Sequence, residues 1–541
     1  MIPMPPFFIA LSQSNPVLGD LSKNADLIAK AAQLASAKGA KLLLTPELSL
    51  TGYPPEDLLL RDAFIQAVDQ QLALLTKTLA AYPDLRVIVG HPKRTAAGLQ
   101  NMASVLYRGE IITSYAKQKL PNHEVFDEVR YFVPGADPCI FEIDGTKVGL
   151  IICEDAWHAS AAAQAKHHGA ELLVIPNASP YHLEKQSLRE DVAKARVLET
   201  GLPLIYLNAV GGQDELVFDG ASFALSKTAQ LALAMPHFQE GLAFIEYKNS
   251  DLVKADVTES SSIEAQVYDA LVLGVKDYLG KNGFPGAIIG LSGGVDSALV
   301  LAIAVDALGA DKVRAVMMPS RYTADISWID AKQMADNLGV QYDEITIAPM
   351  VDAFDGALAN EFKGLPVDAT EENIQARVRG TLLMAMSNKS GRIVLTTGNK
   401  SEMAVGYCTL YGDMAGGFAV IKDIAKTLVY RLCHYRNSIA PVIPERILTR
   451  APSAELRPDQ KDQDSLPEYD ILDAILGLYM EQDESIETII AKGYRPEDVE
   501  KVTRLIKINE YKRRQAPIGV RITQRAFGRD WRYPITNKFR A

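Results

Sequence analysis

The stretch Gly290-Leu291-Ser292-Gly293-Gly294-Val295-Asp296-Ser297 decides the fold of the second half of this chain. It follows an apolar run, 287–289, that predicts a buried strand, and it precedes another, 298–305, that predicts a buried helix. A glycine-rich turn between a strand and a helix lets the backbone approach a phosphate, whose charge the free N–H groups and the helix dipole then stabilise. The Gly-Lys-Ser/Thr ending of a Walker loop is absent. The stretch therefore predicts a phosphate-binding loop of another type in an α/β domain.

Length and composition limit the class of protein. The chain has 541 residues, more than one ordinary hydrophobic core accommodates, so we expect two large domains and allow for a third. Its hydrophobic and charged fractions, 48% and 23%, are typical of soluble globular proteins. A net charge of −11 argues against a nucleic acid as the main partner. The sequence has no apolar run long enough for a membrane span and begins without the pattern of a signal peptide, which predicts a cytoplasmic protein.

The four cysteines, Cys139, Cys153, Cys408 and Cys433, are scattered and form no Cys-x-x-Cys pair. This distribution suits a reducing compartment and argues against both a disulfide framework and a zinc site.

Apolar patterning predicts an α/β protein with a different architecture in each half. In the first half, strands and helices alternate, and two hairpins turn at Arg108-Gly109 and Asp144-Gly145. Hairpins mixed with crossovers predict stacked sheets with outer helices. In the second half, the apolar runs 313–318 and 393–397 are separated by helix-length segments, which predicts a doubly wound parallel sheet.

A polar, weakly patterned segment predicts the domain boundary. We assign residues 1–248 to a first domain, 249–262 to a linker and 263–541 to a second domain. A second polar segment, 450–469, is rich in Pro, Asp and Gln and predicts a mobile surface loop.

Three short motifs in the first half predict nucleophilic chemistry. They are Leu44-Thr45-Pro46-Glu47, Tyr115-Ala116-Lys117-Gln118-Lys119-Leu120-Pro121 and Ile151-Ile152-Cys153-Glu154-Asp155, each at or near the end of a predicted strand. A thiol must lose its proton to attack an amide carbon, a carboxylate can take that proton, and an ammonium stabilises the developing oxyanion. The pattern assigns Cys153 as nucleophile, Glu47 as general base and Lys117 as electrostatic stabiliser.

In this order the motifs resemble the nitrilase, or carbon–nitrogen hydrolase, superfamily over roughly residues 5–245. The resemblance implies an α-β-β-α sandwich that hydrolyses an amide, with L-glutamine as substrate. It favours Lys117 over the competing Lys119, because the family lysine stands three residues before Leu-Pro. It implies a second glutamate after the lysine, for which Glu124 and Glu128 are both candidates. The implied glutamine-binding residues are Ser179, Lys185 and position 123, where His123 stands in place of the usual tyrosine.

The Ser-Gly-Gly-x-Asp-Ser loop resembles the pyrophosphate loop of ATP pyrophosphatases, enzymes of the adenine nucleotide α-hydrolase-like fold that cleave ATP to AMP and pyrophosphate. A carboxylate beside phosphates is consistent with binding only if it holds Mg²⁺, so we expect Asp296 and Glu402 to be metal ligands. The expected ATP-binding residues are Gly290, Leu291, Ser292, Gly293, Gly294, Val295, Asp296, Ser297, Thr397 and Lys426.

Both halves together resemble the glutamine-dependent NAD synthetase family. The resemblance also rests on the segment from Asn373 to Arg377, on Thr396-Thr397-Gly398-Asn399-Lys400-Ser401-Glu402 and on Tyr511-Lys512-Arg513-Arg514-Gln515. It implies ATP-dependent amidation of deamido-NAD through an adenylated intermediate, with ammonia from L-glutamine, and a homo-oligomeric protein. The implied deamido-NAD-binding residues are Asn373, Arg377, Glu402 and Lys512.

Other functions remain open at this point. The phosphate loop and the locally basic end of the chain would also suit an enzyme that adenylates a tRNA base, although the net charge and the amidase motifs argue against it. An amidase joined to an ATP-sensing module is a further alternative. Other glutamine-dependent ATP pyrophosphatases, such as GMP synthetase, use different glutaminase domains.

Overall fold

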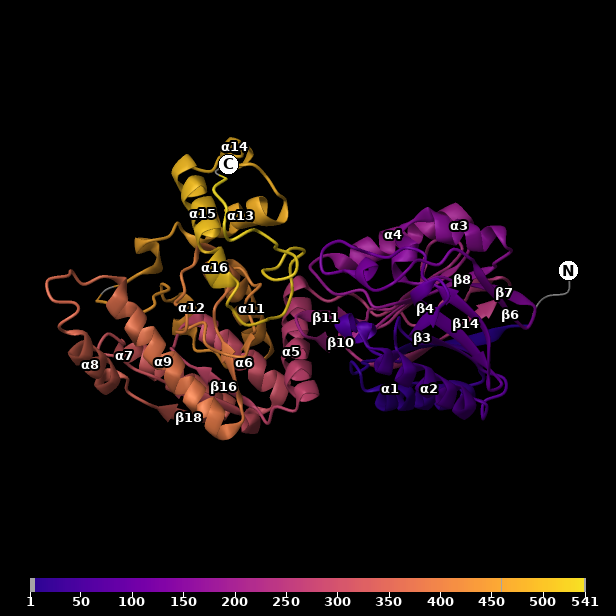
Figure 1. Cartoon of the computed structure of the whole chain (residues 1–541), viewed down its shortest axis with the longest axis horizontal. Coiled ribbons are helices and arrows are strands. Elements are labelled where there is room, and N and C mark those ends of the chain that lie inside the picture. Colours follow the sequence, from indigo (N-terminus) through magenta and orange to yellow (C-terminus); the bar gives the residue numbers. More distant parts are fainter. Residues whose placement is uncertain (1–4, 459, 540–541) are drawn as a thin grey trace. The chain divides into compact units, whose positions relative to one another are not determined.

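The structure, a computed structural model, describes residues 5–458 and 460–539. The chain divides into two compact units, one up to Ser261 and one from Ser262 onward (Figure 1). Among the described residues, no helix has the length and apolar character needed to cross a bilayer.

The first unit contains two stacked sheets. One has the strand order β15-β14-β1-β2-β3-β4-β5 and the other the order β13-β12-β9-β8-β7-β6. The strands of the first sheet are β1 (Phe7–Gln13), β2 (Ala40–Leu44), β3 (Arg86–Thr95), β4 (Gly98–Tyr107), β5 (Glu110–Ala116), β14 (Gly241–Lys248) and β15 (Asp251–Leu252). Those of the second are β6 (Cys139–Ile143), β7 (Thr146–Leu150), β8 (Leu172–Asn177), β9 (Leu204–Asn208), β12 (Phe223–Leu225) and β13 (Leu231–Ala234). A separate hairpin consists of β10 (Val210–Gln213) and β11 (Leu216–Asp219).

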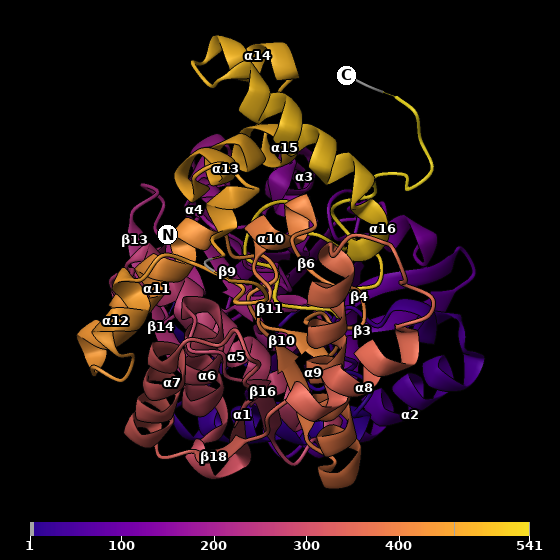
Figure 2. The ribbon, with the colours of Figure 1, turned by 90° about the vertical axis from the view of Figure 1, so that its left-hand side faces the viewer.

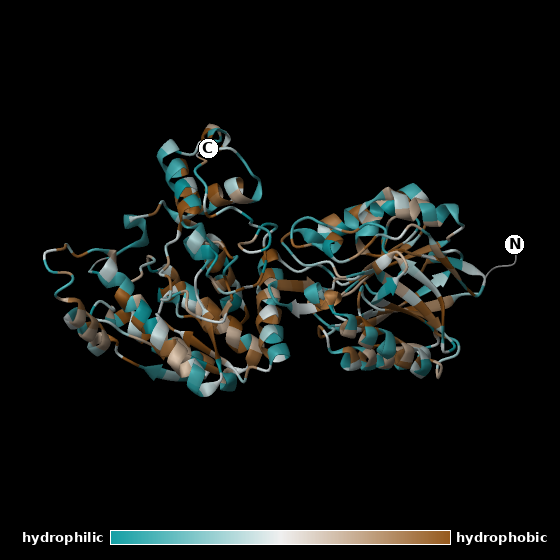
Figure 3. Ribbon diagram, viewed as in Figure 1, coloured by the Kyte–Doolittle hydropathy of each residue, from teal (hydrophilic) through white to brown (hydrophobic). Residues whose placement is uncertain are grey.

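Helices cover both outer faces of this pair of sheets. They are α1 (Leu21–Ala37), α2 (Asp62–Leu79), α3 (Ala159–His167) and α4 (Lys185–Thr200), with α1 and α2 on one side and α3 and α4 on the other (Figure 1). Side chains alternate between the two layers of core: Ile9 and Leu11 of β1 face the other sheet, whereas Ala10 packs with the helices. Figure 3 shows the strands mainly in brown and the covering helices in both colours. The predicted α-β-β-α sandwich is confirmed, and so are both hairpin turns.

The second unit is built on an all-parallel sheet of order β18-β17-β16-β19-β20. Its strands are β16 (Ala287–Gly290), β17 (Val313–Met317), β18 (Gln341–Glu344), β19 (Ile393–Thr396) and β20 (Phe418–Ala419). Helices α5 (Ile263–Asn282), α6 (Val295–Leu308), α7 (Asp325–Leu338) and α11 (Lys426–Ile439) accompany it, with α8 (Ala348–Leu358) and α9 (Ala369–Ser390). Figure 2 shows α6 and α7 to one side of β16 and α9 and α8 to the other, as expected for a doubly wound sheet.

Further helices complete the second unit. They are α10 (Lys400–Val405), α12 (Glu445–Thr449), α13 (Tyr469–Leu476), α14 (Ile486–Ala491), α15 (Pro496–Ile508) and α16 (Glu510–Arg513). Apolar side chains of α10, α13 and α15 share one core, which fixes the segment that follows β19.

Part of the expected linker, 249–262, is hydrogen-bonded to the sheets of the first unit. Strand β15 pairs with β14, and backbone N–H groups of Ala255 and Thr258 donate to Ala232 and Ala234 of β13. The physical reason is that polar side chains do not prevent a segment from hydrogen bonding through its backbone to a sheet edge.

Candidate active sites

Cys153 lies at a strained turn directly after β7. It begins a short 3-10 helix, Cys153–Trp157, with a backbone φ of 45°, a region that residues with a side chain rarely adopt. The residue is only 4% exposed. The Asp155 carboxylate accepts hydrogen bonds from the backbone of Ile152 at 3.0 Å and from the Tyr115 hydroxyl at 2.9 Å. These contacts hold the thiol at the end of the strand in one orientation.

A buried ion cluster accompanies this thiol. The Lys117 ammonium donates to Glu47 Oε1 at 2.7 Å and to Glu128 Oε1 at 2.8 Å, and the side chains of Lys117 and Glu47 are fully buried. Glu47 also accepts from Asn101 Nδ2 at 2.7 Å and from the Ala178 backbone at 3.1 Å. Both oxygens of the Glu47 carboxylate thus accept hydrogen bonds from fixed donors, which orient the carboxylate.

The charges around the cluster set its protonation. Burial and the nearby charge of Glu47 raise the pKa of the Cys153 thiol, while Lys117 opposes this shift. Burial works against the Lys117 ammonium, yet Glu128 and Glu47 hold its pKa well above the usual value. Burial raises the pKa of Glu128 to about 7, although Lys117 pulls it down. The resting site therefore favours a neutral thiol beside a charged lysine.

The geometry separates the competing candidates. Lys117 is the lysine of the cluster, whereas Lys119 is half-buried and its backbone N–H donates to Asp155 Oδ1 at 2.8 Å. Glu128 is the second glutamate of the cluster and accepts from the Tyr53 hydroxyl at 2.8 Å. Glu124 is half-buried on the intervening loop.

The three predicted glutamine-binding residues lie in different environments. Ser179 is buried beside the cluster, because the neighbouring Ala178 contacts Glu47. Lys185, the first residue of α4, places its ammonium 4.4 Å from the ring centre of Trp157, at the end of the nucleophile's short helix. His123 is exposed and packs edge-on against Phe126 at 5.8 Å. The structure therefore brings Ser179 and Lys185 toward the nucleophile segment and leaves His123 at the surface.

Sequence reasoning missed a fully buried arginine behind Ser179. Arg189 of α4 makes two 2.8 Å contacts to the carboxylate of Asp219, and it donates to Ser179 Oγ at 3.1 Å and to the Ser179 carbonyl at 2.7 Å. Arg189 and Asp219 are 30 positions apart, so no local pattern signals their pairing. The roles of Asp155 and Tyr53 were missed too, although Asp155 belongs to the motif that carries Cys153.

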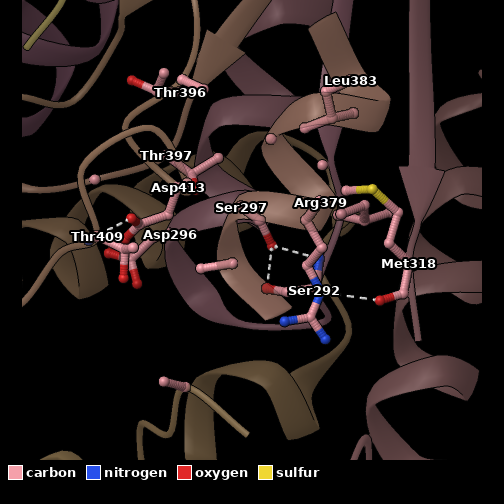
Figure 4. A pocket seen from close by; sticks show the side chains of 18 of the residues that line it. Ser292, Asp296, Ser297, Met318, Arg379, Leu383, Thr396, Thr397, Thr409 and Asp413 are labelled. Carbon is pink, nitrogen blue, oxygen red and sulfur yellow. Dashed lines mark hydrogen bonds between the residues drawn. The ribbon is translucent and has the colours of Figure 1, made fainter. Parts of the chain in front are cut away.

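The phosphate loop of the second unit lies at the point where strand order reverses. A cavity of about 260 Å³ opens there. Its lining includes Gly290, the last residue of β16. Met318 follows β17, and Thr396 and Thr397 stand at the end of β19 (Figure 4). Ligands of open parallel sheets bind at this edge, where the carboxyl ends of strands separate.

Hydrogen bonds hold the loop in shape. Ser292 Oγ and Ser297 Oγ lie 3.1 Å apart, and the Gly294 backbone donates to Ser292 Oγ at 3.2 Å (Figure 4). Gly293 has a φ of 81°, and a Cβ built there would lie 2.4 Å from the Ser327 carbonyl oxygen. Only glycine fits this position. Of the eight loop residues, Gly290, Leu291, Ser292, Asp296 and Ser297 line the cavity.

The two expected metal ligands share a lysine. Lys426 Nζ lies 2.5 Å from Asp296 Oδ2 and 3.2 Å from Glu402 Oε1, and both carboxylates line the cavity. Burial raises the pKa of Glu402 to about 8, with Lys426 opposing and Asp296 adding to the shift. Burial works against the Lys426 ammonium, but the two carboxylates raise its pKa.

No group of three or more His, Cys, Asp or Glu side chains in the described part of the chain is arranged to hold a metal alone. Two adjacent carboxylates still suit Mg²⁺, which usually takes one or two protein carboxylates together with phosphate oxygens. The donor set therefore fits a magnesium ion that arrives with a nucleotide.

The four residues expected to bind deamido-NAD lie in two different places. Glu402 lines the cavity, whereas the other three contact the segment 406–410. Lys512 Nζ donates to the carbonyls of Gly406 and Cys408, both at 2.8 Å, and Arg377 Nε donates to that of Leu410 at 3.3 Å. Asn373 Oδ1 accepts from Thr409, which itself lines the cavity.

The segment 450–469 was predicted to be a surface loop, but part of it is buried, and part of it lines the cavity. Ala454, Glu455 and Leu456 line the cavity. Glu455 accepts from Ser327 Oγ at 2.7 Å, and Asp462 is 3% exposed and accepts from the Tyr469 hydroxyl at 2.8 Å. A polar composition predicts exposure only where a chain finds no buried partners for its polar groups, and here it finds them.

Comparisons with known proteins agree with both sites. The carbon–nitrogen hydrolase family model matches residues 8–255 and the NAD synthase model matches residues 267–516. The glutamine-dependent NAD(+) synthetase of Acinetobacter baylyi is 49% identical over 99% of both chains, and that of Xylella fastidiosa strain 9a5c is 47% identical over 98% of this chain and 99% of the relative.

The chain belongs to the glutamine-dependent NAD(+) synthetase family. A solved structure of such a synthetase from Acinetobacter baumannii, in complex with ADP, is 44% identical and superposes with a TM-score of 0.80 over 98% of both chains. A synthetase from Cytophaga hutchinsonii, 21% identical, has the same fold with a TM-score of 0.84 over 98% of both chains. Membership in the synthetase family decides against the tRNA-modifying and ATP-sensing alternatives.

Proposed function

We propose that this chain synthesises NAD⁺ from deamido-NAD, with ATP and with ammonia that its first unit releases from L-glutamine. Family membership supports the reaction as a whole. The observation that carries the residue assignment is the buried Lys117–Glu47–Glu128 cluster around Cys153 in one unit, together with the phosphate-loop cavity in the other.

In the first unit, Glu47 takes the proton of Cys153 as the sulfur attacks the amide carbon of glutamine. The same carboxyl group then returns a proton to the departing ammonia, and water hydrolyses the thioester. Lys117, held between two carboxylates, stabilises the oxyanion of each tetrahedral intermediate. Glu128 is assigned to hold Lys117 in place. Ser179 and Lys185 are assigned to the amino-acid end of glutamine, and His123 contributes only if its loop moves toward the site.

In the second unit, the amides of the loop 292–297 and the dipole of α6 bind the phosphates of ATP. The nicotinate carboxylate of deamido-NAD attacks the α-phosphorus, pyrophosphate leaves, and ammonia displaces AMP from the adenylate. Mg²⁺ bound by Asp296 and Glu402 would reduce the charge repulsion among the phosphates. Lys426 and Thr397 are assigned to ATP, and Asn373, Arg377, Glu402 and Lys512 to deamido-NAD.

Three expectations from the sequence stay predictions within this proposal. They are the domain division at 249–262, the homo-oligomeric state and the cytosolic location.

The test is an assay of purified protein with ATP, Mg²⁺ and deamido-NAD, in which glutamine and ammonium are compared as nitrogen sources. We expect equal amounts of NAD⁺ and AMP with either source. ATP cleavage without deamido-NAD would contradict the proposal, and so would NAD⁺ formation from ammonium but not from glutamine.

A further inference from the structure

One cationic side chain that lines the phosphate-loop cavity lacks a carboxylate partner. Arg379 of α9 lines the cavity (Figure 4). Its Nε donates to the carbonyl oxygen of Met318 at 3.0 Å, which fixes the plane of the guanidinium. Across residues 5–458 and 460–539, no carboxylate lies within 4.0 Å of its terminal nitrogens. Glu455, whose charge opposes the lowering of the Arg379 pKa, is already paired with Arg450 and Ser327.

This arrangement is unusual for a guanidinium that is half-buried in the wall of a cavity. Burial lowers the pKa of Arg379 to about 10, with Glu455 opposing. Burying a charge without a partner costs free energy, so charged side chains in such places normally have a carboxylate or a ligand. The two terminal nitrogens of a fixed guanidinium match two oxygens of a phosphate group.

The other cation expected at the phosphates is less available. Lys426 is held between Asp296 and Glu402 at 2.5 and 3.2 Å, so its charge is already compensated. The positive potential facing the cavity therefore comes from the loop amides, the N-terminus of α6 and Arg379. The apolar neighbours of Arg379 on the cavity, Met318 and Leu383, are suited to a base or ribose and offer no charge to it.

We propose that Arg379 binds phosphate oxyanions of ATP in this cavity, and that the nucleotide supplies the anionic partner that its guanidinium lacks in the protein alone. The proposal rests on the proposed function, because it takes the cavity to be the ATP site. The same helix carries Arg377, which was expected from the sequence to bind deamido-NAD and instead donates to Leu410 outside the cavity. Two positions along a helix turn a side chain to a different face, which separates the two arginines.

The test measures binding of ATP with Mg²⁺, pyrophosphate with Mg²⁺, AMP and adenosine to the full chain by titration calorimetry. Arg379→Met is expected to weaken ATP binding about ten- to a hundredfold, because charge-assisted hydrogen bonds are lost, and to leave adenosine binding unchanged. Arg379→Lys keeps the charge without the two-pronged geometry and should recover part of the loss. Whichever of pyrophosphate and AMP weakens in parallel identifies the phosphate group that Arg379 contacts.

Lys389→Met is the matched control, since it removes one positive charge from the exposed end of the same helix. Without nucleotide, Arg379→Met should melt no lower than the wild type, because it removes a charge that lacks a partner. Unchanged ATP affinity would overturn the inference, as would an equal loss of adenosine affinity. If the wild type itself bound neither ATP nor pyrophosphate, the proposed function would fail together with the inference. If Arg379→Met does not fold, Arg379→Lys alone decides, with unchanged ATP and pyrophosphate affinity as the contradicting result.

Discussion

The two candidate sites are organised in opposite ways. Around Cys153, Lys117 forms ion pairs with both Glu47 and Glu128, and all three side chains are buried. In the second unit, backbone amides and glycines form the binding surface, and Arg379 lacks a carboxylate partner within ion-pair distance, as far as the described residues extend. The difference indicates that the amidase centre is preorganised for chemistry, whereas the ATP site is completed by its ligand.

Replacing the nucleophile is expected to have the largest effect and to separate the two sites most clearly. Cys153→Ala should lower NAD⁺ synthesis from glutamine by at least about a thousandfold, because no other thiol reaches the cluster. Synthesis from ammonium should persist, since it needs only the second unit. Cys139→Ala, a change of another buried cysteine in the same unit, is the control and should leave both reactions intact. Equal loss of the ammonium reaction in Cys153→Ala would contradict the division between sites.

Gly293→Ala in the phosphate loop is expected to disable the second unit and leave the first one active. The added methyl group would meet the Ser327 carbonyl at 2.4 Å and would require a strained φ, so the loop must shift. We expect both glutamine- and ammonium-dependent synthesis to fall by about a hundredfold or more, while glutamine hydrolysis measured as glutamate release continues. Gly356→Ala, on α8, has open space around the added Cβ and should be neutral. Full activity of Gly293→Ala would show that the loop does not hold the phosphates as proposed.

A smaller effect on the first unit alone is expected from Asp155→Asn. Asp155 accepts from the backbone of Ile152, Gln118 and Lys119, so an amide NH₂ in place of one oxygen would face a donor. The turn that carries Cys153 and the segment after Lys117 would then no longer be hydrogen-bonded to the same carboxylate. We expect kcat for glutamine to fall about ten- to a hundredfold with little change in the ammonium reaction. Asp137→Asn, on the exposed surface nearby, serves as control. A changed KM with normal kcat would mean that Asp155 affects binding only.

The smallest expected effect is a change in the pH dependence of stability. The folded pKa of Glu128 is raised from 4.5 to about 7, so the folded state binds more protons than the unfolded state between these values. Its contribution to stability is therefore complete below about pH 4.5 and is lost as the pH rises through 7. Glu128→Gln cannot ionise and should show a flatter profile, with a difference of at most about 3 kcal/mol at pH 8. Thermal melts from pH 5 to 8 measure this slope, and parallel profiles for the two proteins would contradict the shift.

Much of the fold follows from local pattern in the sequence. Strands such as β16 and β19 are short apolar runs with clear ends, and the turns at Gly109 and Gly145 need glycine for local reasons. The strand β15 inside the expected linker was harder to predict, because it has only two residues and is held by backbone pairing with β14, the strand just before it.

In both sites, the motif residues could be predicted from the sequence, but the residues that hold them in position could not. Spacing left Glu124 and Glu128 equivalent, since both stand on an irregular loop whose path decides which reaches Lys117. Likewise Arg377 and Arg379 stand on one helix, and only its packing tells which of them faces the cavity. Arg189 is paired with Asp219 across two elements, a contact that a single sequence does not reveal.

The raised pKa of the Cys153 thiol has a consequence for the survival of the protein under oxidative stress. Peroxides and alkylating agents react with the sulfur anion and hardly at all with the neutral sulfhydryl. A thiol whose pKa is raised by burial is therefore expected to react slowly with such reagents while no substrate is bound.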